Sequence, residues 1–255
     1  MKRFTSVGVS VFAIAVAAAG WELVAVYGSF PPKLFPGLGA IAQALVRVAG
    51  DGVLLAAAEA TLVRLVAGFA IAAVIGVLVG ILMGRYQWLE DMLLPVVSFF
   101  NPIPGVAYAP LFVLWFGLGD FAVILLVGLN SCLPIIVNVW TGTKAVKPIW
   151  LRCAQVMGAR DREIFWRIIL PAALPDIFTG LRIGLSNAWR ILIAVEMLMA
   201  VSRGLGWMIF GAQEFLNTDI MLATIAVIGV IGIGLEWLFA RLERGTVVRW
   251  GMMNP

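Results

Sequence analysis

Long apolar segments dominate this chain and limit what it can fold into. Its 255 residues are 62% hydrophobic and only 13% charged, and the mean hydropathy is +1.03. Because soluble domains carry about a quarter charged residues, a soluble fold of this chain would lack a polar surface. The composition therefore predicts an all-α integral membrane protein.

Six segments are apolar over roughly the 20 residues that a helix needs to cross the hydrocarbon core. They are Val7–Tyr27, Thr61–Met83, Met92–Phe116, Phe121–Gly142, Ile177–Val201 and Ile220–Ala240. In the third, Asn101-Pro102-Ile103-Pro104 fits two interpretations. One is a helix broken inside the bundle, where irregular backbone is tolerated, and the other is a loop joining two short segments.

The distribution of Lys and Arg between alternate loops predicts the orientation, because cytoplasmic loops carry the excess. One side receives Lys33, Arg47 and Arg203. The other side receives a much larger set: Lys2, Arg3, Arg85, Lys144, Lys147, Arg152, Arg160, Arg162, Arg167, Arg241, Arg244 and Arg249. Both termini and the loop Gly142–Pro175 are therefore predicted to be cytoplasmic. The first segment also resembles a signal peptide, but its length favours an uncleaved span.

The predicted organisation has three parts. Residues 1–60 form an N-terminal transmembrane helix and an external amphipathic segment, in which Ile41, Leu45 and Val48 recur at helical spacing. Residues 61–245 form the transmembrane core, with a cytoplasmic loop at 143–175, and residues 246–255 form a cytoplasmic tail. Small residues four apart in the second span predict close packing against another helix: Gly76, Gly80 and Gly84.

The cytoplasmic loop has the pattern of two short helices at an angle. Pro148 suits the first turn of one helix, and Gly158 can take the positive φ that ends it. Asp161 is expected to cap the second helix, and Pro171 and Pro175 are expected to disrupt or kink its continuation. Among a linker, a membrane-surface helix and a docking element, only the last explains both the glycine corner and the mixed apolar and basic face.

The spacing in this loop resembles the signature of permeases in bacterial ATP-driven (ABC) importers. That signature is Glu-Ala-Ala, three residues, Gly, nine residues, Ile, one residue and Leu-Pro. Here Arg152 and Cys153 replace the Glu and the first Ala, while the later positions keep their register. The resemblance implies an ATPase-coupling loop made of Arg152, Cys153, Ala154, Gly158, Ala159, Ile168, Leu170 and Pro171.

The similarity extends from about Leu34 to Trp250, with segments such as Ile103-Pro104-Gly105-Val106-Ala107-Tyr108-Ala109-Pro110-Leu111. These resemble the nitrate, taurine, aliphatic-sulfonate and bicarbonate branch of the family. The resemblance implies a type I (MetI-like) permease fold with six transmembrane helices in the bacterial inner membrane. It also implies a second copy of the chain, two cytoplasmic ATPase subunits, a periplasmic or lipid-anchored solute-binding protein, and a small anion as cargo.

The chain itself is not expected to be an enzyme. It contains no histidine, and no Gly-x-x-x-x-Gly-Lys-Ser/Thr motif for nucleotide binding. We therefore expect a partner subunit to bind ATP and Mg²⁺, and this chain to hold no metal or cofactor and no nucleic acid. An intramembrane hydrolase using Ser131, Cys132 or Glu196 would lack a base. An ion-coupled secondary transporter is the main alternative, although it gives the cytoplasmic loop no role.

Polar residues inside spans usually face a bundle interior or a cavity. On the fifth span, a 100° advance per residue places several polar residues within one arc, and the fourth span repeats this pattern. The candidate pathway residues are Asn101, Tyr108, Asn130, Ser131, Asn138, Ser186, Arg190 and Glu196. Two alternatives remain open: Glu196 and Arg190 could instead form structural ion pairs, and Asn130 and Asn138 could instead hydrogen-bond between helices.

Overall fold

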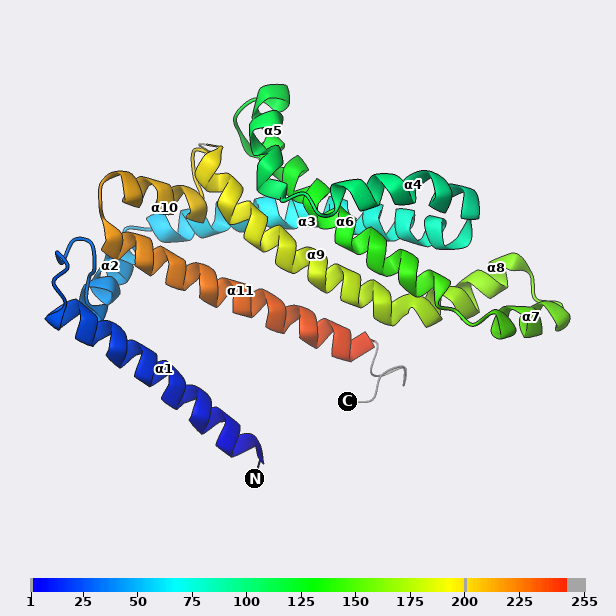
Figure 1. Cartoon of the computed structure of the whole chain (residues 1–255), viewed down its shortest axis with the longest axis horizontal. Helices are drawn as coiled ribbons and strands as arrows, with labels where there is room; N and C mark the ends of the chain where they lie inside the picture. Colours follow the sequence, from blue (N-terminus) through cyan, green and yellow to red (C-terminus); the bar gives the residue numbers. More distant parts are fainter. Residues whose placement is uncertain (1, 200, 247–255) are drawn as a thin grey trace.

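The computed structural model describes residues 2–199 and 201–246, and every regular element in this part of the chain is helical (Figure 1). The elements are α1 (Lys2–Tyr27), α2 (Leu38–Gly50), α3 (Val53–Arg85), α4 (Gln87–Phe100), η1 (Gly105–Tyr108), α5 (Ala109–Phe116), α6 (Asp120–Lys144), α7 (Pro148–Val156), α8 (Asp161–Ile164), η2 (Phe165–Ile169), α9 (Leu170–Leu198), α10 (Leu205–Glu214) and α11 (Thr218–Thr246).

Three long helices form the centre of the bundle, with α6 packed against both α3 and α9. The small residues of α3 allow this packing, as predicted. A Cβ atom on Gly76 would lie 2.7 Å from Cγ2 of Ile135, and one on Gly80 would lie 2.7 Å from Cβ of Val139. Gly84 meets Thr143 one turn further along. The backbones of α3 and α6 approach closely because these positions lack side chains.

Five of the six predicted spans coincide with helices of the described residues that could cross a membrane, if the bent pair below counts as one span. In the described residues, four helices are long and apolar enough to cross a membrane: α3, α6, α11 and the continuous helix Asp161–Leu198. The pair α4 and η1–α5 would make a fifth, and its two parts are bent by 91°. The predicted break at Asn101–Pro104 is therefore confirmed. The first predicted span, Val7–Tyr27, lies within the helix α1.

The expected disturbance of the helix by Pro171 is present as a local π turn, and the chain stays helical through it. The helix continues from Asp161 to Leu198. Immediately before Pro171 it widens into the π-helix η2, in which the N–H of Leu170 donates to the carbonyl of Phe165. A proline removes a donor and crowds the preceding turn, and a π turn accommodates such a disturbance without breaking the helix.

The helix α1 joins the bundle only near its C-terminal end and diverges from the other helices in Figure 1. The indole N–H of Trp21 donates to the carbonyl of Pro36 at 3.0 Å, and its ring stacks on Phe35. The Glu22 carboxylate accepts the N–H of Leu38 at 2.7 Å, at the start of α2. These contacts hold α2, the predicted external amphipathic helix, against the C-terminal end of α1.

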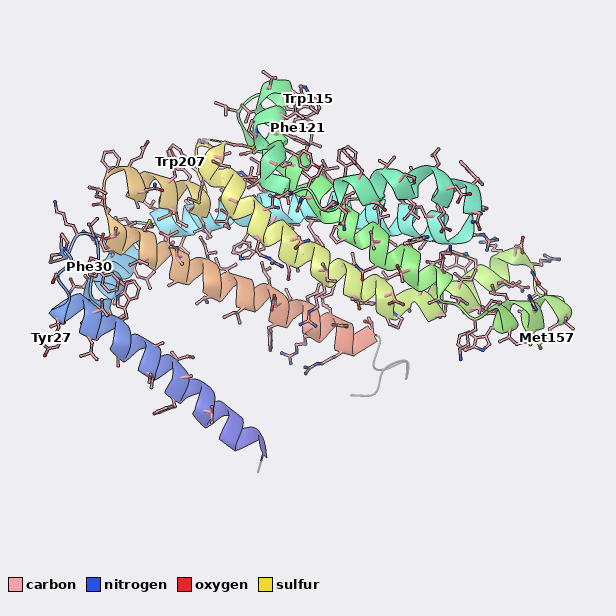
Figure 2. All side chains as sticks on the ribbon, in the orientation of Figure 1. Tyr27, Phe30, Trp115, Phe121, Met157 and Trp207 are labelled. Carbon is pink, nitrogen blue, oxygen red and sulfur yellow. The ribbon has the colours of Figure 1, made fainter. Side chains whose placement is uncertain are left out.

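The ends of the bundle carry different elements (Figure 1). The helices α2 and α10 lie at one end, and α7 and α8 lie at the opposite end. The C-terminal end of α11 is directed away from α2 and α10. A third feature is α5, which projects from the bundle, with Trp115 and Phe121 at its tip in Figure 2. Both side chains are 63% exposed, so this projection offers an apolar surface.

We predict that Gly80→Ala lowers stability by pushing α3 away from α6. Overpacking of this kind costs about 1–3 kcal/mol. The measurement is the thermal unfolding midpoint of the purified protein in detergent. Gly229→Ala is the matched control, because a Cβ atom at Gly229 on α11 has no neighbour within 4 Å. Equal midpoints for the two variants would show that the glycines of α3 are not needed for packing.

Candidate functional site

A cavity of about 460 Å³ lies where the corner between α4 and α5 meets α6 and α9. Its wall contains Asn101 from the corner, Asn130 from α6, and Asn187 and Arg190 from α9. The structure thus brings together three of the predicted pathway residues, Asn101, Asn130 and Arg190. Sequence reasoning missed Asn187, although it precedes Arg190 by three residues and so shares its helix face.

Local sequence explains how the corner reaches the two helices. Pro102 and Pro104 have no backbone N–H, so the irregular corner has two fewer donors to satisfy inside the bundle. At Gly105, an added Cβ atom would collide with the side-chain amide of Asn130 and lie 2.8 Å from Cδ1 of Ile191. Glycine at this position therefore lets the corner form the wall of the cavity directly against α6 and α9.

Two predicted pathway residues on α6 bond within their own helix. The hydroxyl of Ser131 is fully buried and donates to the carbonyl of Val127 at 2.7 Å. The side-chain amide of Asn138 donates to the carbonyl of Pro134 at 2.8 Å. Asn138 also packs against α9, since a Cβ atom on Gly180 would lie 2.9 Å from its Cβ. Neither residue lines the cavity.

Two others also lie outside the cavity wall. The ring of Tyr108 packs near Phe100, and its hydroxyl is buried without a hydrogen-bond partner among the described residues. Ser186 faces α11, where its hydroxyl donates to the Glu236 carboxylate at 3.2 Å. A second, smaller cavity of about 160 Å³ lies there between α9 and α11, and Arg190 borders both cavities.

Glu196 lies in a buried polar cluster near the end of the bundle that carries α10. Its side chain is 0% exposed, and Arg64 of α3 donates to its carboxylate at 2.6 Å. The hydroxyl of Thr61 lies 3.0 Å from both carboxylate oxygens, and the N–H of Gly206 donates at 3.0 Å. In this structure Glu196 is therefore an ion-pair partner within the protein, while its role in a pathway stays a prediction.

The cluster reaches further through Arg64, which is 3% exposed. Its guanidinium also donates to the Asp120 carboxylate at 2.8 Å, at the start of α6, and to the carbonyl of Arg203 at 2.6 Å. Sequence analysis did not identify Arg64 as a site residue, although an arginine inside an apolar span is a signal of a buried polar contact or a cavity. Because Leu205 N–H donates to Thr61 at 2.9 Å, four helices meet here: α3, α6, α9 and α10.

The predicted coupling loop forms a helical hairpin, α7 and α8, which we call the α7–α8 hairpin. Gly158 has φ +81° and closes α7, and its N–H donates to the carbonyl of Gln155 at 2.9 Å. The cap of α8 differs from the prediction. Arg160, not Asp161, is the N-cap residue, and its N–H donates to the Glu163 carboxylate at 2.9 Å.

The α7–α8 hairpin has a small buried base and an exposed tip. Its base is an apolar cluster of Val146, Ala154, Ile164 and Ile169. At the tip, Val156 is 89% and Met157 is 86% exposed, and Met157 lies at the extremity of the molecule in Figure 2. Among the predicted coupling residues, Ala154 is buried and the exposed ones are Arg152, Cys153 and Gly158; the half-buried ones are Ala159, Ile168, Leu170 and Pro171.

Apolar spans around a polar cavity, with an exposed helical hairpin at one end, define a membrane transport subunit. Residues 72–248 match the family described as binding-protein-dependent transport system inner membrane component, and this chain belongs to that family. It is therefore an inner-membrane permease of a binding-protein-dependent importer.

Curated relatives narrow the branch of the family. The chain is 38% identical to the taurine transport system permease protein TauC of Escherichia coli (strain K12), over 93% of this chain and 88% of that protein. It is 31% identical to the putative aliphatic sulfonates transport permease protein SsuC of Bacillus subtilis (strain 168), over 92% and 85%. It is also 36% identical to the bicarbonate transport system permease protein CmpB of Synechococcus elongatus, over 72% and 66%.

Solved structures show the same fold. A chain of the MetNI methionine ABC transporter in an inward-facing conformation aligns with a TM-score of 0.66 at 20% identity, covering 76% of this chain and 95% of that chain. An amino acid ABC transporter crystallised with histidines aligns with a TM-score of 0.64 at 16% identity, covering 80% and 97%. The predicted type I importer permease fold is thus confirmed, and so is the predicted branch.

We predict that Glu196→Ala destabilises the protein, because it leaves Arg64 buried with one fewer carboxylate. Breaking a buried ion pair by removing one partner costs about 3–5 kcal/mol. The thermal unfolding midpoint in detergent measures the loss. Glu59→Ala is the control, since Glu59 is exposed on the same α3 helix. A midpoint for Glu196→Ala equal to that of the control would refute a structural role for the cluster.

Proposed function

We propose that this chain forms the solute passage of an ATP-driven importer of small anions and couples to a separate ATPase through the α7–α8 hairpin. The observation that supports this most directly is the hairpin itself. It carries exposed apolar side chains at the end of the bundle opposite α2 and α10. Such a surface on a short basic loop suits a soluble protein partner better than lipid or water.

The connection from the α7–α8 hairpin to the cavity supports the same proposal. The helix that starts at Asp161 in the hairpin continues without a break through Arg190 in the cavity wall. On the other side, α6 joins the hairpin after Lys144, whose ammonium group pairs with the Glu90 carboxylate at 2.6 Å. A displacement of the hairpin by a partner would therefore reach both helices that line the cavity.

The remaining partners are part of the proposal. The chain has no nucleotide-binding motif, so two cytoplasmic ATPase subunits bind ATP and Mg²⁺ while a second copy of the chain completes the passage. A periplasmic or lipid-anchored solute-binding protein delivers the solute at the α2 and α10 end, and both termini are cytoplasmic. The named relatives handle taurine, aliphatic sulfonates and bicarbonate, which supports a small anion such as these, or nitrate, as cargo.

We predict that Gly158→Asp abolishes ATP-driven uptake in proteoliposomes while the permease still assembles in the membrane. An aspartate at φ +81° strains the hairpin corner and places a new charge at the docking surface. The readouts are uptake of radiolabelled taurine, tested beside bicarbonate and nitrate, and ATP hydrolysis by the reconstituted complex.

Gly117→Asp is the matched control, because Gly117 has φ +78° and open space around it at the end of α5, away from the α2 and α10 end. It introduces the same residue and a similar backbone strain away from the hairpin, so uptake should continue. Uptake by Gly158→Asp at the wild-type rate would contradict coupling through the hairpin. Uptake by the unmodified chain without any ATPase would favour the ion-coupled alternative.

The two cysteines provide a test of orientation without any mutation. Cys153 is exposed on α7, and Cys132 is buried in α6. We predict that a membrane-impermeant maleimide labels Cys153 in inside-out vesicles but not in intact spheroplasts, and that Cys132 stays unlabelled in both. Peptide mass spectrometry identifies the modified residue. Labelling of Cys153 from the outside would reverse the proposed topology.

A further inference from the structure

The cavity between the α4–α5 corner, α6 and α9 has an unusual set of polar groups for a membrane interior. Its wall contains three asparagine amides and one guanidinium, and no aspartate or glutamate. The amide of Asn138 bonds within its own helix. In contrast, the side chains of Asn101, Asn130 and Asn187 have no hydrogen-bond partner among the described residues. Their donors are therefore available to a molecule in the cavity.

The charge of this cavity comes from Arg190. Its Nε donates to the carbonyl of Ser186 at 3.1 Å, one turn earlier on α9. In the described part of the chain it forms no ion pair, and Glu236 across the second cavity instead accepts from the Ser186 hydroxyl. An unpaired arginine inside a span carries a large free-energy cost. An anion bound beside it would offset that cost.

We infer that this cavity is a binding site for a small oxyanion inside the membrane, an assignment that rests on the proposed importer function. The Arg190 guanidinium presents planar, forked donors that match two oxygens of a sulfonate or carbonate group. The amides of Asn101, Asn130 and Asn187 supply further donors around the same volume. At about 460 Å³, the cavity falls within the range of small-molecule sites and admits a solute together with water.

A second feature of the wall suits ligands that also carry a donor. Pro134 has no N–H, so the carbonyl of Asn130 has no partner one turn later in α6. Asn130 and Pro134 both line the cavity. The wall therefore combines donors for an oxyanion with a carbonyl acceptor. Taurine, which carries an ammonium group, and bicarbonate, which carries a hydroxyl, satisfy both, whereas nitrate satisfies only the donors.

The test uses the full complex of permease, ATPase and solute-binding protein in nanodiscs. Cys132 and Cys153 are replaced by alanine, and Ala194→Cys is introduced in the cavity wall, at a position that has no donor of its own. A negatively charged methanethiosulfonate reagent then labels the new thiol with and without taurine, bicarbonate or nitrate. Ser131→Cys is the control, since Ser131 is fully buried on α6 outside the wall, and it should stay unlabelled throughout.

We expect one of the three anions to slow labelling of Ala194→Cys at least fivefold relative to chloride. The anion that protects most strongly identifies the ligand class. Adding Arg190→Gln should remove this protection. Adding Arg182→Gln, a change of the same kind on the same helix, should preserve it, because Arg182 lies 3.8 Å from Glu243 near the cytoplasmic end.

Three results would overturn the assignment: a thiol at position 194 that is never labelled, labelling that none of the anions slows, or protection that survives Arg190→Gln. Failure of the importer proposal would look different. In that case the unmodified complex would not assemble with the ATPase, or would not hydrolyse ATP in response to the loaded binding protein. ATP hydrolysis is measured on the same nanodiscs before any labelling, so the two failures are distinguished.

Discussion

The buried contact between Glu196 and Arg64 holds together the end of this bundle that carries α10. Inside a membrane, association of helices gains little from the hydrophobic effect, because lipid tails are as apolar as the side chains they replace. The helices instead rely on close backbone approach, as at Gly76 and Gly80, and on polar contacts. The Arg64 guanidinium joins α3 to α6, α9 and the start of α10 through hydrogen bonds of 2.6–2.8 Å. Removing either charge would leave its partner in a dry interior.

Because this contact anchors one end of the helix from Asp161 to Leu198, that helix can transmit a displacement from its other end. One end of that helix belongs to the exposed α7–α8 hairpin, and Glu196 lies near the other end. The cavity residues Asn187 and Arg190 lie between the two. Under the proposed function, a partner that moves the hairpin acts on a helix whose far end is anchored. The displacement therefore moves the part of the helix that forms the cavity wall. The π turn before Pro171 keeps the helix continuous through this region.

Hydropathy and spacing predicted most of the architecture, because each depends on local sequence. The spans, the broken third segment and the α7–α8 hairpin all have such signals. The pathway residues were harder to place, since a helix in a bundle has several neighbours. Ser186 and Arg190 share an arc of α9, yet Ser186 bonds to α11 while Arg190 also borders α6. Periodicity gives the face of a residue but not the helix opposite to it, and it could not show that Arg64 was the partner of Glu196.

Arg64 and Arg190, both inside spans, show how the surroundings of an arginine decide whether its charge is paired within the protein. Arg64 is 3% exposed and contacts two carboxylates and a carbonyl, so its charge is neutralised entirely within the protein. Arg190 forms no ion pair among the described residues: one cavity that it borders has no acid in its wall, and the acid of the other, Glu236, accepts from Ser186. In a region of low dielectric constant, a charge without a partner is retained only where something external compensates it. The same residue type therefore stabilises the bundle at one position and, at the other, marks the place where an anion would bind.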